Sequence, residues 1–373
     1  MRILAIAAVL LTACSMWGSG PIQSPIPIDS ASPSPTPANS KAVDLRTKVD
    51  LLLGEHVMVV AKQATAAANK TEEHAAYASL LIANTTSLLD IIRSAYGNTA
   101  ASQFEKSWGT QNGYLVDYTI GLVSHNEAKS NGAKSGLANG FGPEFAKLIN
   151  TLTQISVDQM TQLETRQMTA MQQVIEDAAA QSFPKMYVDL RAAYAMSAGI
   201  GDMLATRTAQ QFPDKFPGDL SSKAADARVS LNVLLQEHSY LATMTTDAAA
   251  AQRTNEQAGA AAALGANADA LGKLFTEVSG AGAGTQIAQL WGSRNSDLIA
   301  YATSGDATAR QGLTEKFITR FYGLTPLGSD SLRDQVLATI KVIDDQRAKN
   351  FKVVAGDDRA AAAAMQAVAD HIA

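Results

Sequence analysis

Cysteine is almost absent from this sequence, since Cys14 is the only one in 373 residues. A framework of intramolecular disulfides is therefore excluded. Aromatic residues make up only 6% of the chain, whereas alanine is abundant. Proline is rare after residue 41, where only five remain: Pro143, Pro184, Pro213, Pro217 and Pro326. Long alanine-rich stretches without proline are typical of helices, because alanine is the best helix former. The sequence predicts an all-α fold.

Basic runs are also missing, and 35 acidic residues outnumber 30 lysines and arginines for a net charge of −5. This mildly acidic balance argues against nucleic acid as a partner. The chain has no Gly-x-Ser-x-Gly elbow, no His-Glu-x-x-His motif and no phosphate-cradling glycine loop. The paired Glu-x-x-His motifs of di-iron bundles are absent as well. We therefore expect no enzymatic activity and no cofactor.

The N-terminus has the order of parts that a secretory signal needs. Arg2 gives a basic start, residues 3–11 form an apolar run, and Leu11-Thr12-Ala13-Cys14 follows. Such a short run cannot cross roughly 30 Å of hydrocarbon as a permanent helix, so it predicts a cleaved signal peptide over residues 1–13. The last four residues resemble the lipobox of bacterial lipoproteins. The resemblance implies a diacylglyceryl thioether and acylation (palmitate in many lipoproteins) at Cys14. The alternative is an ordinary secretory signal with a chance cysteine.

Residues 14–41 combine the lipidated cysteine with a tether. Six of the eleven prolines lie here among serines and threonines: Pro21, Pro25, Pro27, Pro33, Pro35 and Pro37. Such a composition predicts an extended, disordered segment, either a stalk or a simple spacer. No later stretch is expected to span a membrane. The sequence thus predicts an extracytoplasmic protein that is lipid-anchored to the cell membrane.

The rest of the chain repeats itself. Leu53-Gly54-Glu55-His56 recurs as Leu235-Gln236-Glu237-His238, and Trp108-Gly109 recurs as Trp291-Gly292. Offsets of 182 to 183 residues hold through these blocks, and a later offset of 168 relates Arg191 to Arg359. The shorter offset indicates an insertion in the first copy around residues 132–142. We predict two tandem up-and-down bundles of about six helices each, over residues 42–208 and 223–373, joined by a linker at residues 209–222.

The predicted helices of the first bundle lie near residues 42–69, 72–95, 99–125, 143–151, 156–181 and 184–208. Those of the second bundle lie near residues 223–249, 252–278, 284–302, 306–323, 329–353 and 356–372. The two bundles are expected to meet near residues 207–222.

Three repeated polar residues lie on apolar helical stripes and at equal distances from the predicted turns. Equal distances from a turn give equal heights in an antiparallel bundle, so each bundle should contain a His–Asn–Asn layer. The members are His56, Asn84 and Asn112 in the first copy, and His238, Asn267 and Asn295 in the second. Trp108 and Trp291 should lie one turn away.

Two interpretations of this layer stay open. Buried amides and imidazoles need hydrogen bonds, and a satisfied network fixes which helices pair. Alternatively, the layer binds a metal or a small ligand, with Glu55 and Glu237 as additional ligands. One histidine per bundle is few for a transition metal. Met160, Met168 and Met171 also suggest either soft-metal binding or core packing.

The order Glu55-His56, Trp108 and Asp117-Tyr118-Thr119 resembles poorly characterised helical surface proteins of bacteria, some of them mislabelled as copper amine oxidase-like. The resemblance covers most of residues 45–373 in two copies. Family members often carry a histidine three residues after the tryptophan, where this chain has Gln111 and Arg294. The sequence favours a non-enzymatic, membrane-tethered module that binds an envelope protein or a small ligand. The alternative is a metal-handling, copper-binding envelope lipoprotein with one site per bundle.

Overall fold

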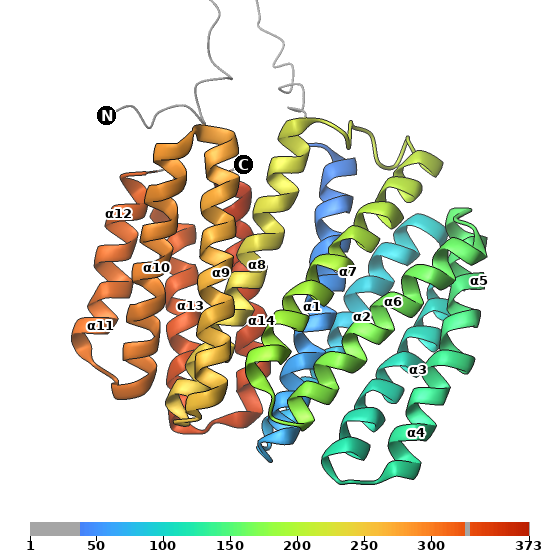
Figure 1. The fold of residues 1–373 in the computed structure, drawn as a ribbon. Coiled ribbons are helices and arrows are strands. Elements are labelled where there is room, and N and C mark those ends of the chain that lie inside the picture. The colour runs from blue at the N-terminus through green and yellow to red at the C-terminus, as the bar shows by residue number, and fades with distance from the viewer. Residues whose placement is uncertain (1–37, 325–328, 373) are drawn as a thin grey trace, which may run out of the picture.

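A computed structural model describes residues 38–324 and 329–372, and these residues form helices and short connections without a strand (Figure 1). The predicted all-α fold is confirmed. The predicted signal peptide, Cys14 and the tether up to residue 37 lie outside the described residues.

The helices follow the order of the two sequence repeats. The first copy contains α1 (Lys41–Ala68), α2 (Glu73–Tyr96), α3 (Asn98–Val123), α4 (Glu127–Ser135), the π-helix η2 (Gly136–Phe141), α5 (Gly142–Thr153), α6 (Val157–Ala179) and α7 (Phe183–Gln211). The second copy contains α8 (Lys223–Ala250), α9 (Thr254–Ser279), α10 (Ala281–Ser304), α11 (Ala307–Gln311), the π-helix η3 (Gly312–Phe317), α12 (Ile318–Tyr322), α13 (Ser329–Ala348) and α14 (Phe351–Ile372).

Helix starts and junctions are set by the same residue types in both copies. Ser40 and Ser222 cap α1 and α8, each accepting a hydrogen bond from the backbone N–H three residues later. Gly97 and Gly280 join the second and third helices with φ angles of 88° and 92°, which strongly favour glycine. These junctions explain why the predicted ends of these helices fall close to the observed ones.

The fourth helix of the first copy is longer than predicted. The sequence places a helix near 143–151 after an irregular, glycine-rich insertion, but α4, η2 and α5 form a nearly continuous helical segment. Leu137, Phe141, Phe145 and Ile149 recur every four residues and are all buried, so packing overrides the low helix propensity of the glycines. The π-helical turn of η2 has a counterpart of equal length, η3, in the second copy.

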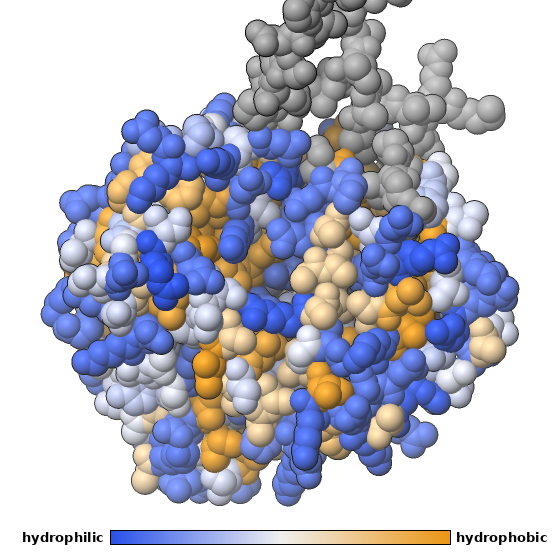
Figure 2. All heavy atoms as spheres, turned by 180° about the vertical axis from the view of Figure 1, so that it is seen from behind, coloured by the Kyte–Doolittle hydropathy of each residue, from blue (hydrophilic) through white to orange (hydrophobic). Residues whose placement is uncertain are grey.

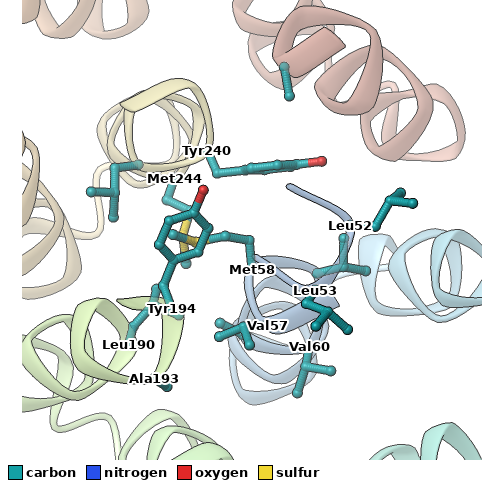
Figure 3. Close-up of a cluster of buried hydrophobic side chains, with 14 of the residues drawn as sticks. Leu52, Leu53, Val57, Met58, Val60, Leu190, Ala193, Tyr194, Tyr240 and Met244 are labelled. Carbon is teal, nitrogen blue, oxygen red and sulfur yellow. The ribbon is translucent and has the colours of Figure 1, made fainter. Parts of the chain in front are cut away.

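The two copies share one core. Helices α1 and α8 lie side by side in the centre of the molecule, α7 packs on α9, and α14 packs on α2 (Figure 1). The buried cluster in Figure 3 combines residues of α1, α7 and α8. The expectation that two separate bundles meet only near residues 207–222 is therefore wrong. The reason is that α1 is buried on all sides from Leu51 to Ala67, so its apolar surface exceeds a single stripe.

Helix α2 is the one described helix whose length and composition would suffice to cross a membrane. This differs from the expectation that no segment after the tether is apolar enough. The helix nevertheless contacts α1, α3 and α14, and Asn84 at its middle is fully buried. We therefore treat α2 as a core helix. The rear face of the molecule is mostly hydrophilic with scattered apolar side chains (Figure 2).

Candidate functional site

The predicted polar residues of the first copy are buried at mid-height. The imidazole Nε2 of His56 lies 2.8 Å from Oδ1 of Asn112, and the amide of Asn112 donates to Thr85 Oγ1 at 3.0 Å. The ring of Trp108 lies 4.9 Å from that of His56. Asn84 bonds elsewhere, since its amide donates to Glu55 Oε2 at 2.7 Å. The structure thus brings His56 and Asn112 into contact and joins Asn84 to the neighbouring glutamate.

The second copy uses a different pairing of the same residue types. His238 Nδ1 lies 2.9 Å from Oδ1 of Asn267, and Arg294 donates to Nε2 of His238 at 2.8 Å. Both ring nitrogens of this histidine are therefore engaged, which leaves none for a metal. Asn295 is buried, but its Oδ1 has no partner within the described chain. The ring of Trp291 lies 4.4 Å from that of His238.

The glutamates beside the two histidines join one copy to the other. Glu55 accepts hydrogen bonds from Arg359 at 3.0 Å and from Tyr240 at 3.0 Å, both of the second copy. Glu237 in turn accepts from Arg191 of the first copy at 2.8 Å. Glu55 and Glu237, which the sequence suggests as additional ligands of a metal or small molecule, are thus hydrogen-bonded to arginines. The sequence shows the repeated arginines, but it does not show that each one pairs across the copies.

Both histidines are neutral at neutral pH. Burial lowers the pKa of His56 to about 4, with the bond to Asn112 opposing the shift. Burial and the nearby Arg294 charge lower the pKa of His238 well below its usual value. Within residues 38–324 and 329–372, no group of three or more His, Cys, Asp or Glu side chains could hold a metal ion.

A cavity of about 70 Å³ lies beside the polar layer of the first copy. Its walls come from α1, α2, α3, α5, α6 and α7, and they are almost entirely apolar. It extends from His56 and Trp108 to Tyr96 and Thr208, at the end of the molecule where α1 begins. At that end the lining side chains of Ile92, Leu152 and Leu204 are partly exposed, so the cavity comes close to the surface there.

Four polar side chains line this cavity with unpaired atoms. Trp108 Nε1 is a free donor, and the Oε1 atoms of Gln111, Glu164 and Gln167 are free acceptors, as judged from the described residues. Their residues are between 1% and 6% exposed. Buried polar atoms without a partner are costly and rare in native structures. These four atoms therefore mark the cavity as a candidate ligand site.

Glu164 was not singled out from the sequence, although its position among the methionines of α6 indicates it. The predicted methionine stripe of Met160, Met168 and Met171 lines the cavity, and Glu164 lies one turn from both Met160 and Met168. An acid on an apolar stripe is unusual. Burial raises the pKa of Glu164 to about 8, so this carboxyl group is mainly protonated at pH 7.

The second copy has a buried arginine at the position that corresponds to Gln111. Arg294 stands where the first copy has Gln111, and its guanidinium lies 5.2 Å from the ring of Trp291 and 5.3 Å from that of Phe317. It also donates to Gln335 at 3.2 Å. Arg294 is 1% exposed, and burial lowers its pKa to about 9.

No protein-family model, no curated protein and no solved structure matches this chain. The site is therefore interpreted from its own geometry.

Proposed function

We propose that the protein is a lipid-tethered, non-enzymatic binding module of the cell envelope, and that its first copy binds a small, mainly apolar molecule. The observation that supports this proposal is the apolar cavity beside His56 and Trp108, with its unpaired polar atoms. Ligand sites are typically apolar hollows with a few convergent polar groups, and this cavity has that character. Its free space accommodates about five water-sized groups, which suits a compact ligand with a chain of about four carbon atoms and one polar group.

The methionines of the wall also favour binding. Met160, Met168 and Met171 are unbranched and polarisable, so they can adjust to the shape of a ligand. The lipid anchor at Cys14 would hold the cavity near the membrane surface.

Calorimetric titration and thermal unfolding with pentane and 1-butanol, which match the free space of the cavity, test this proposal. Both probes should bind the wild type and raise its melting temperature, because a ligand that binds only the folded state stabilises it. The variant Gln111→Arg places the arginine of the second copy in the cavity and should abolish binding. The matched control Gln257→Arg adds the same charge on α9, away from the residues that line the cavity, and should bind as the wild type does. Equal binding to wild type and Gln111→Arg, or no binding of any probe to a folded wild type, would refute the proposal.

A further inference from the structure

From the contrast between the two copies we infer that the first copy binds a small organic cation, an aliphatic primary amine with an apolar body. This inference rests on the proposed function of the cavity. The ammonium group would lie among Gln111, Glu164 and Gln167, and the apolar body would extend toward Leu204 and Tyr96.

The unpaired atoms of the cavity favour a ligand that donates hydrogen bonds. Three of the four are acceptor oxygens, on Gln111, Glu164 and Gln167, and only Trp108 offers a donor. A primary ammonium carries three N–H donors and no acceptor, so its hydrogen-bonding capacity matches the three oxygens. A carboxylate or phosphate would instead leave the amide oxygens of Gln111 and Gln167 unpaired.

The second copy shows which charge this environment accepts. Arg294, the counterpart of Gln111, places a buried cation against the tryptophan ring and against Gln335, the counterpart of Gln167. In the first copy a neutral glutamine stands at this position and lines the cavity. The rings of Trp108 and Phe145, 5.5 Å apart, also line the cavity. Aromatic rings of this kind attract a cation through their faces.

The first copy also supplies an ionisable acid that the second copy lacks. Glu164 aligns with Leu332 in the repeat, and it has no hydrogen-bond partner in the described part of the chain. Binding of an ammonium would favour the carboxylate form of Glu164, and the carboxyl proton would pass to the solvent. The other titratable groups that line the cavity are His56 and Tyr96.

A series of probes with one body and different head groups tests the inference. The series consists of butylamine, 1-butanol, pentane and butyrate, titrated calorimetrically at pH 7. The amine should bind at least about tenfold more tightly than the alcohol, since a tenfold difference needs only one favourable charged contact. In buffers of different ionisation enthalpy, the amine should release close to one proton and the alcohol none.

Two substitutions of Glu164 separate a cation site from a merely apolar one. Glu164→Leu, which copies the second copy, and Glu164→Gln should both remove the preference for the amine and its proton release. Both variants should keep the binding of pentane. If the alcohol and pentane bind but the amine binds no better, or if Glu164→Leu keeps the preference, the inference is wrong while the proposed function stands. If none of the four probes binds the folded wild type, the proposed function itself fails.

Discussion

The buried ion pair between Lys62 and Asp358 provides the sharpest test of the shared core. Lys62 of α1 donates to the carboxylate of Asp358 on α14, and Tyr77 of α2 donates to the same oxygen at 2.6 Å. The two charged residues are 5% and 1% exposed. At the positions related by the repeat, the chain has Met244 and Leu190, which lie in the buried apolar cluster of Figure 3.

Removing one charged partner of this pair should lower the stability of the protein far more than replacing all three polar side chains together. Asp358→Leu leaves the ammonium of Lys62 buried without its counter-ion, which costs about 3–5 kcal/mol of unfolding free energy. The triple variant is Lys62→Met, Tyr77→Phe and Asp358→Leu. The first and third substitutions introduce the residue types found at the related positions, Met244 and Leu190, and Tyr77→Phe removes the hydroxyl that would otherwise lose its partner. Its stability should lie within about 1 kcal/mol of the wild type or above it, because apolar replacements avoid the desolvation of two ions.

Urea unfolding followed by circular dichroism measures the unfolding free energy of both variants. Asp358→Leu should strongly lower the urea concentration at the midpoint of unfolding. The triple variant should restore this midpoint without changing the dependence of the unfolding free energy on urea concentration. If Asp358→Leu lost less than about 1 kcal/mol, or if the triple variant were less stable than the single one, the pair would not lie in a dry, shared core.

Three further predictions concern the layer, the cavity and the anchor. His56→Ala and His238→Ala should each lose roughly 1–3 kcal/mol plus a cavity contribution, and a chelator should not change the wild-type melting curve if the layer is structural. Because the pKa of Glu164 is about 8 when folded and about 4.5 when unfolded, its contribution to stability is complete below pH 4.5 and declines until pH 8. Glu164→Leu should therefore gain stability relative to the wild type by up to roughly 1.4 kcal/mol per pH unit across this window, which melts at pH 5 and pH 8 would reveal. Cys14→Ala should release the protein from membranes in a fractionation assay, and continued membrane association with wild-type migration would exclude lipidation at this residue.

Helix positions were predictable because they depend on local signals. Alanine-rich stretches without proline indicated where helices lie, and the predicted helix ends at residues 95 and 278 fall within two residues of Gly97 and Gly280. The insertion near residue 137 was misread because its glycines have low helix propensity, whereas the buried spacing of Leu137 and Phe141 decides the outcome. Local propensity is a weak guide wherever packing opposes it.

The shared core was not predictable from periodicity along one stripe. The sequence of α1 contains both a stripe through Val49 and His56 and a continuous run at Val57-Met58-Val59-Val60. The continuous run indicates burial on all sides, but it does not identify the partner helix. The residues of the polar layer were found because they recur in both copies. The cavity was not found, because it depends on volume left between six helices.

The ion pairs that cross between the copies also determine the order in which the molecule can be completed. Glu55 and its partner Arg359 are 304 residues apart in the chain. During synthesis from the N-terminus, α1 therefore exists for a long time without the helices that cover its second side. Contacts of such long range form slowly, because a large loop must close first. The first copy must stay competent to receive α8 and α14 until α14 has been made, so a product truncated before α14 would expose part of the second side of α1.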